Sequence, residues 1–197
     1  MGDRIKTAIE IAMEKAASLE DLSPEEKEVM KSRKKLEPLM KEFYNGEISP
    51  DEFWQKLKGN NTVMLSEAQL NLIDSIKFGI ADAEFQKRKK GILAIETLKE
   101  EKNTPSIEQG LNLIESLQKK AELEKEQVYL NFKKVIEKNP QARMRSIEQG
   151  DATVVVKLSV EEAINQNPQW KQFLMEHQKN CSQEFARIVD GLKKELF

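Results

Sequence analysis

The sequence of 197 residues has very little of the chemistry that builds metal sites and disulfide scaffolds, with one cysteine, Cys181, and one histidine, His177. A single cysteine excludes an internal disulfide framework and is typical of a protein kept in a reducing compartment. A structural zinc site would have to complete its four ligands with carboxylates, which suit zinc poorly beside a thiolate. We therefore expect neither a bound metal nor a disulfide scaffold.

Long apolar runs are also missing from the sequence. No stretch approaches the roughly 18 residues of a transmembrane helix. The residues that follow Met1 are punctuated by glutamate and lysine, whereas a signal peptide has an apolar centre. These features predict a soluble, cytoplasmic protein that does not insert into a membrane.

The sequence has no large excess of one charge. It contains 32 Lys and Arg residues and 34 Asp and Glu residues, for a net charge of −2. No global field therefore attracts nucleic acid or an anionic membrane, so either partner would need a local patch. Aromatic residues make up only 6% of the chain and charged residues 34%. This balance is typical of long amphipathic helices, so the composition predicts a mainly α protein.

Motifs for catalysis and nucleotide binding are missing as well. The sequence has no phosphate-binding glycine loop, no Rossmann fingerprint, no nucleophile elbow and no His-Glu-x-x-His. His177 and Cys181 are four residues apart and share a helix face with Leu174 and Phe185, which favours a packed histidine and a buried, inert thiol. We predict a protein that is not an enzyme and that uses no cofactor and no small-molecule substrate.

The first 60 residues carry the signals of short helices. Residues 3–18 have apolar side chains at helical spacing. Ser23 and Glu26 form a capping box that starts the next helix. In that helix, Pro38 lacks an amide hydrogen and clashes with the preceding turn, which predicts a kink or a break. We take residues 1–60 as an N-terminal group of helices that includes a short helical hairpin.

Within this group, residues 36–58 read LEPLMKEFYNGEISPDEFWQKLK. The pattern is a helix, then Gly-Glu-Ile-Ser at residues 46–49, then a second helix. Ser49 caps this second helix, whose first turn is acidic and is followed by Phe53. This pattern resembles the SHOCT-type short helical hairpin, and the resemblance covers 23 of the 197 residues. The sequence departs from the SHOCT pattern at Pro38 and Trp54.

Two long helices are predicted over residues 61–140, the first at 66–101 and the second at 106–138. Each begins with a serine followed three residues later by glutamine, as in a capping box. Gly79 and Gly91 weaken the first helix. A connection this short should fold the two helices back into an antiparallel, coiled-coil-like hairpin. The seam of the second helix consists of Ile107, Leu111, Ile114, Ala121, Val128, Phe132 and Val135.

The remaining residues, 141–197, combine one strand signal with two more helices. Residues 62–65 and 152–158 are the only strand candidates, so we predict that they pair as a two-stranded ribbon; otherwise 152–158 pairs with another chain. Helices are predicted at 160–166 and from Pro168 to about Leu196. The second has the most continuous apolar stripe: Trp170, Phe173, Leu174, His177, Cys181, Phe185, Ile188, Val189 and Leu192.

The leading prediction of function is protein binding through the helical arm, as an adaptor or assembly protein whose partner is another protein or a second copy. A polar run at residues 86–90 interrupts the apolar stripe of the first long helix. The apolar residues beyond this run would form an exposed docking patch towards the tip of the arm. The predicted contact residues are Ile92, Leu93, Ile95 and Leu98.

The alternative is a factor that binds nucleic acid or the ribosome through two basic runs. Such binding needs a stripe of side chains that neutralise phosphates, and Glu28, Glu37 and Glu84 dilute these runs. A solvated helix face is the competing interpretation. The residues concerned are Lys31, Arg33, Lys34 and Lys35 in the first run, and Lys87, Arg88, Lys89 and Lys90 in the second.

Overall fold

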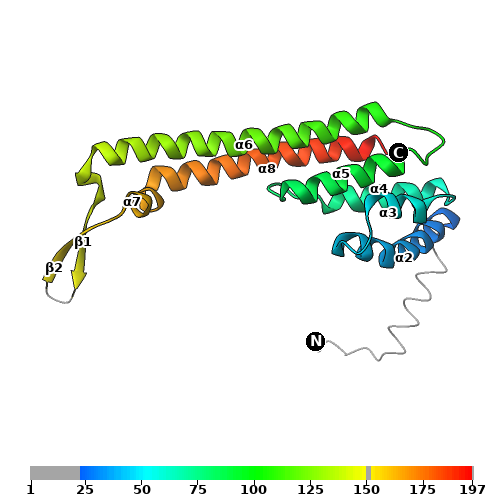
Figure 1. Cartoon of the computed structure of the whole chain (residues 1–197), viewed down its shortest axis with the longest axis horizontal. Helices are drawn as coiled ribbons and strands as arrows, with labels where there is room; N and C mark the ends of the chain where they lie inside the picture. The colour runs from blue at the N-terminus through cyan, green and yellow to red at the C-terminus, as the bar shows by residue number, and fades with distance from the viewer. Residues whose placement is uncertain (1–22, 150–151, 197) are drawn as a thin grey trace, which may run out of the picture. The chain divides into compact units, whose positions relative to one another are not determined.

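The computed structural model describes residues 23–149 and 152–196, and these form helices and one small ribbon (Figure 1). The mainly helical class is confirmed, as are a pair of long helices packed together and a two-stranded antiparallel ribbon. The predicted helix at 3–18 lies outside the described residues. The chain divides into two compact units. Unit 1 is Met1–Ile107 with Glu195–Phe197, and unit 2 is Glu108–Lys194.

Unit 1 is built from short helices whose starts were readable from the sequence. At the first, the Ser23 hydroxyl accepts from the backbone N–H of Glu26 at 3.2 Å, and the Glu26 carboxylate accepts from the backbone N–H of Ser23 at 2.8 Å. Ser49 begins the next helix in the same way. Pro38 lies inside the first helix without ending it. The helices are α2 (Pro24–Asn45), α3 (Pro50–Leu57), α4 (Thr62–Ser75) and α5 (Asp82–Glu96).

The first of the two predicted long helices is interrupted, and this corrects the expectation for residues 66–101. Helix α4 ends at Ser75 and α5 begins at Asp82. Between them Gly79 has a φ of +80°, a left-handed conformation that no helix interior allows and that glycine adopts readily. The glycine therefore supplies a turn, and α4 packs against α5.

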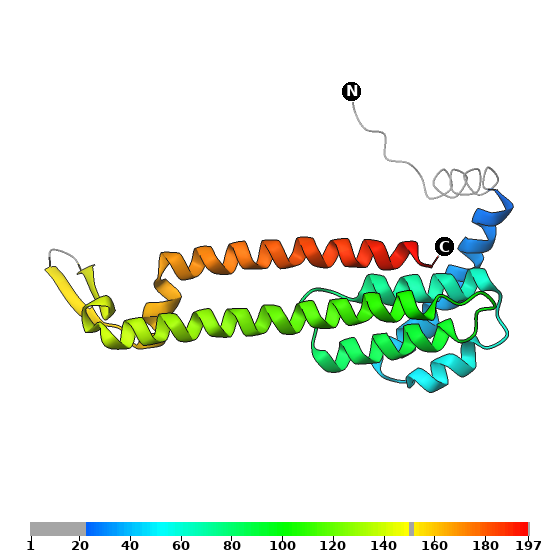
Figure 2. The ribbon, with the colours of Figure 1, turned by 90° about the horizontal axis from the view of Figure 1, so that it is seen from above.

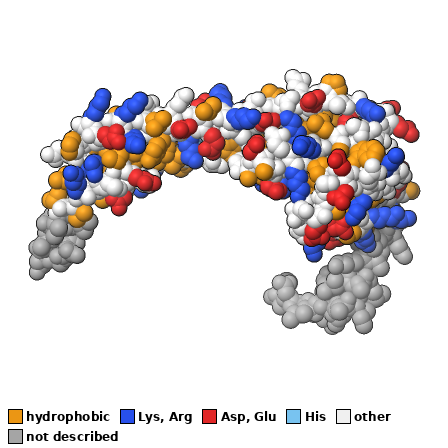
Figure 3. Space-filling model, viewed as in Figure 1, with side chains coloured by type: hydrophobic (Ala, Val, Ile, Leu, Met, Phe, Trp, Pro, Cys, Tyr) orange, Lys and Arg blue, Asp and Glu red, His pale blue; other side chains and the backbone are white. Residues whose placement is uncertain are grey.

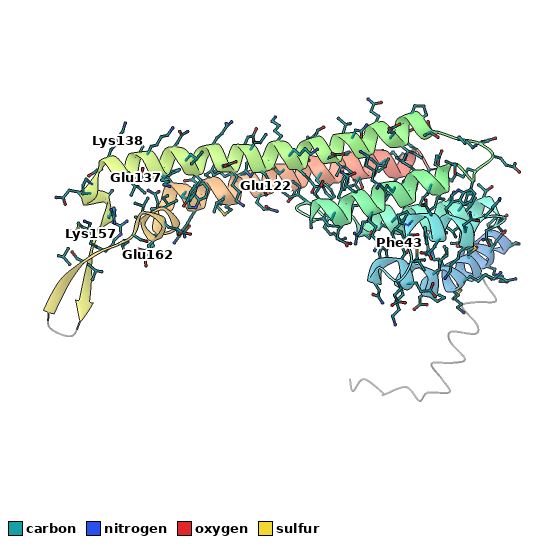
Figure 4. All side chains as sticks on the ribbon, viewed as in Figure 1. Phe43, Glu122, Glu137, Lys138, Lys157 and Glu162 are labelled. Carbon is teal, nitrogen blue, oxygen red and sulfur yellow. The ribbon has the colours of Figure 1, made fainter. Side chains whose placement is uncertain are left out.

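The core of unit 1 forms where α2, α3, α4 and α5 meet. The rings of Phe43 and Phe53 lie 4.6 Å apart between centroids, and both side chains are fully buried. Phe43 is labelled among these helices in Figure 4. Helix α5 approaches closely at Gly91, where an added Cβ would lie 3.0 Å from Leu72 Cδ1 and 3.2 Å from Phe43 Cζ. Gly91 is therefore a packing position.

Unit 2 contains most of α6 (Thr104–Lys138) and all of α8 (Pro168–Lys194), and the two helices run antiparallel (Figures 1 and 2). The second predicted long helix is thus present, with its end at Lys138 as expected. The contacts identify α8 as a partner of α6: Tyr129 meets Trp170, and Glu124 meets His177. The prediction had paired α6 with residues 66–101 because a short connection was assumed to join them.

The ribbon of unit 2 follows α6 directly. After a 3₁₀ turn, η1 (Pro140–Arg143), strand β1 (Met144–Gln149) pairs antiparallel with β2 (Ala152–Lys157). The predicted partner strand, 62–65, is instead the first turn of α4, where the Asn61 side chain accepts from the backbone N–H of Met64. Helix α7 (Val160–Gln166) then begins with the expected capping box at Ser159.

No helix in the described ranges is both long enough and apolar enough to cross a lipid bilayer.

Candidate interaction surface

The seam of α6 is the first part of the candidate surface. Leu111, Ile114 and Ala121 are buried as the heptad spacing predicts. Towards the C-terminal end the spacing changes, because Val135 is 65% exposed and Ile136 takes the buried position. Gly110 also belongs to the contact with α8, since a Cβ there would lie 2.9 Å from Leu192 Cδ1.

An aromatic cluster joins α6 to the start of α8. The ring of Trp170 lies 5.8 Å from those of Tyr129 and Phe132 in edge-to-face contacts, and it stacks on Phe173 at 5.6 Å. Trp170 is also buried against α7, in one core with Ala163, Ile164 and Ile136. The cluster fixes α6, α7 and α8 to one another within unit 2.

Beside this cluster lies an open groove of about 340 Å³. Tyr129 and Trp170 supply apolar wall, and Leu123 is 58% exposed at the rim. The other lining side chains are charged, with Glu122 labelled in Figure 4. We call this feature the α6–α8 groove, and its lining residues are Glu122, Leu123, Lys125, Glu126, Tyr129 and Trp170.

The helix pair leaves part of its apolar stripe in contact with solvent. Many side chains of the stripe, including Phe173, Phe185 and Ile188, are only half-buried. Figure 3 shows hydrophobic side chains gathered among the charged ones of α6 and α8. The large apolar side chains of these two helices that are exposed outright are Leu113, Leu123, Leu130, Val135 and Met175.

The only histidine and the only cysteine of the sequence, His177 and Cys181, lie on α8 close to Glu124 of α6. His177 Nε2 lies 3.4 Å from a Glu124 carboxylate oxygen and 3.8 Å from Cys181 Sγ. Burial, followed by the negative charge of Glu124, raises the pKa of the Cys181 thiol, and the nearby Lys120 lowers it only in part. A thiol held in its neutral form is a poor nucleophile and a poor metal ligand. The arrangement therefore fits a packing role.

A reactivity assay checks the electrostatics of Cys181. Because its pKa is raised, less thiolate is present at pH 8 than in a free cysteine peptide, and iodoacetamide should label the native protein more slowly. The rate should rise about tenfold for each pH unit below the pKa. Glu124→Gln removes the charge that disfavours the thiolate and should speed labelling. An equal rate for protein and peptide would contradict this description.

The predicted docking patch does not exist as an exposed surface. Ile92 and Ile95 are fully buried in the core of unit 1, and only Leu93 and Leu98 are half-exposed. The prediction failed because it assumed one straight helix with a free tip. The break at Gly79 folds α5 against α4 and turns these isoleucines inwards.

The second basic run is mostly engaged within unit 1. Lys87 Nζ lies 4.9 Å above the Phe43 ring, and Arg88 bonds Glu84 and the Ser75 hydroxyl while lying 5.5 Å from the Tyr44 ring. Lys89 and Lys90 belong to the same helix turn. Lys87 and Arg88 are therefore engaged within unit 1, and Lys89 also makes an interaction of its own.

The first basic run lies on α2 and is largely in solvent. Arg33 pairs with the buried carboxylate of Glu67, at 2.6 Å and 3.2 Å, which raises the pKa of the guanidinium. Lys31, Lys34 and Lys35 are exposed. Only three of the four predicted cations therefore remain for a partner.

A buried polar network in unit 1 was not foreseen. Gln69 donates to Glu96 at 2.8 Å, and the backbone N–H of Asn103 donates to the other oxygen of Glu96. The side chain of Lys99 is 6% exposed, with its Nζ 3.9 Å from Glu96, and burial lowers its pKa. The network ties α4 and α5 to the start of α6. The sequence gives no signal for it, because each residue alone reads as a surface position.

Neither the residues nor the comparisons point to known chemistry. Among residues 23–149 and 152–196, no three His, Cys, Asp or Glu side chains are grouped to hold a metal ion. No protein-family model, curated protein or solved structure matches the chain. The resemblance of residues 36–58 to the SHOCT-type hairpin stays a prediction.

Proposed function

We propose that this chain is a non-catalytic protein-binding protein, an adaptor or assembly factor, and that its binding element is the α6–α8 groove. One observation carries the proposal. A large apolar side chain, Leu123, is 58% exposed at the rim of a groove whose wall contains a firmly held tryptophan and tyrosine. The occupant that fits best is an amphipathic helix of a partner protein.

The physical argument starts from burial. Two helices packed along one seam cover only part of their apolar stripes, and a third helix laid along the groove removes more of that surface from water. Rigid aromatic residues in a groove are the side chains that most often dominate binding energy. The charged rim of Glu122, Lys125 and Glu126 suits a helix with mixed charge beside its apolar face.

Leu123→Asp tests this proposal without threatening the fold, because Leu123 is not part of the core. It places a charge where the partner's apolar face would pack, so recovery of the partner should fall at least tenfold, as a loss of about 1.4 kcal/mol implies. Capture from an extract of the source organism, quantified by mass spectrometry, measures that recovery.

Leu113→Asp is the matched control. Leu113 lies on the same helix, is 50% exposed and does not line the groove. A partner must lose recovery with Leu123→Asp and keep it with Leu113→Asp. If no captured protein separates the two variants, the groove is not the binding element.

A further inference from the structure

A hollow in unit 1 has buried charged side chains in its wall. It measures about 600 Å³, which lies within the range of about 300–1,000 Å³ that is typical of small-molecule sites. Helices α2 and α4, the end of α5 and the connection from α5 to α6 contribute to the wall. The lining residues that matter here are Val29, Val63, Glu96, Lys99, Lys102 and Leu196.

Lys99 is the most informative of these residues. Its side chain is 6% exposed although it lines the hollow. It lies just beyond the end of α5, where its backbone N–H donates to the Glu96 carbonyl at 3.3 Å. Lysine is rarely buried to this degree. The hollow therefore offers small molecules a route to an amine that the rest of unit 1 covers.

The charge nearest to this amine is the buried carboxylate of Glu96. Lys99 Nζ lies 3.9 Å from Glu96 Oε2, which is longer than a hydrogen bond. The two oxygens of Glu96 accept instead from Gln69 Nε2 and from the backbone N–H of Asn103. Burial lowers the pKa of Lys99, and the charge of Glu96 opposes that effect only in part. More of the amine is therefore neutral than in an exposed lysine, and the neutral amine is the nucleophile.

The remaining wall suits a small molecule with an apolar body. Val29 and Val63 are half-buried, and Leu196 is buried. A second lysine, Lys102, lines the same hollow but is exposed. The hollow therefore has two amines in different environments, and the exposed one is an internal reference for Lys99.

We propose that Lys99 captures a small aldehyde with an apolar body, reversibly, as an imine. The amine nitrogen attacks the carbonyl carbon, the π electron pair moves to oxygen, and one proton passes from nitrogen to that oxygen. The second nitrogen proton then leaves with the hydroxyl as water while the C=N bond forms. Glu96 is the carboxylate near enough to carry these protons. Amine and aldehyde give imine and water, so the step needs neither an oxidant nor a reductant.

Reductive trapping of the full chain with benzaldehyde and sodium cyanoborohydride tests the proposal, because the reductant turns each imine into a stable benzylamine. Peptide mass spectrometry then gives the labelling rate of each lysine. In the native chain Lys99 should react at least about tenfold faster than Lys102, since the hollow holds the aldehyde beside the amine. Benzyl alcohol, which cannot form an imine, should compete for the hollow and slow the labelling of Lys99 but not of lysines outside it.

Lys102→Arg is the matched control, because it keeps the charge and removes the other amine of the hollow. It should leave the labelling rate of Lys99 unchanged, whereas Lys99→Arg should abolish the fast reaction. The comparison of Lys99 with Lys102 uses the original chain and does not depend on how either variant folds. The proposal is overturned if Lys99 reacts no faster than Lys102, if benzyl alcohol does not slow it, or if unfolding in urea speeds its labelling relative to Lys102.

Discussion

Replacing Trp170 by alanine is expected to destabilise unit 2 more than any other single truncation in that unit. The indole is 5% exposed and contacts Tyr129, Phe132 and Phe173. Removing a buried tryptophan deletes its apolar contacts and leaves a cavity, a change that typically costs about 3–5 kcal/mol. Urea unfolding monitored by circular dichroism measures the loss in the free energy of unfolding. Hydrogen exchange of the α8 amides shows whether the loss falls on unit 2.

Trp54→Ala provides the comparison, because Trp54 is only partly buried. Its indole N–H donates a hydrogen bond to the Thr97 hydroxyl at 2.9 Å. It should lower stability less and should leave exchange in α8 unchanged. Equal losses from the two variants, or protected amides in α8 after Trp170→Ala, would contradict the role given to the aromatic cluster.

Ile95→Asp should unfold unit 1. Ile95 is fully buried, so an aspartate there either carries an unpaired charge in the core or must be protonated. Such substitutions belong to the rare class that costs more than about 4 kcal/mol. The same change at half-exposed Leu98 should be much milder.

Ile95→Val separates charge from packing, since it removes one methylene and should cost about 0.5–1.5 kcal/mol. Chemical denaturation of Ile95→Asp, Leu98→Asp and Ile95→Val beside the original chain ranks the three losses of stability. If Ile95→Asp keeps the stability of the original chain, Ile95 is exposed and α5 is not packed as described.

Local helix signals were the most predictive part of the sequence. The capping boxes at Ser23, Ser49 and Ser159 all form, each with the serine and glutamate reciprocally bonded. These signals succeed because both partners lie within four residues, so tertiary structure has little influence on them. A similar pattern at Ser66 and Gln69 gave a wrong helix start, because α4 begins at Thr62 and buries both side chains.

The partner of a long helix could not be predicted from its stripe. The apolar seam of α6 predicts only that another apolar helix face packs against it. Both residues 66–101 and the C-terminal helix have such a face. The decision rested on Gly79, which was counted as a weak helix residue when it is a left-handed turn. Once α4 and α5 pack against each other, the C-terminal stripe is the one available to pair with α6.

The candidate sites depended on exposure, which spacing alone does not give. Ile92 and Leu93 are neighbours in sequence, yet only the second reaches the surface. The reverse holds at Ser32, which spacing predicts to be an exposed polar position within a basic run and which is in fact buried. Leu123 was passed over because it lies off the seam, and an off-seam leucine has no periodic signal.

Photo-crosslinking tests the central claim, that a partner helix lies in the α6–α8 groove, most directly. A benzophenone amino acid replaces Leu123 in one sample and Leu113 in another, and cells of the source organism are irradiated before crosslinked peptides are sequenced. We expect position 123 to capture one protein through an amphipathic helical segment, while position 113 captures little of it. Capture at 113 equal to that at 123, or none at 123, would contradict the proposal.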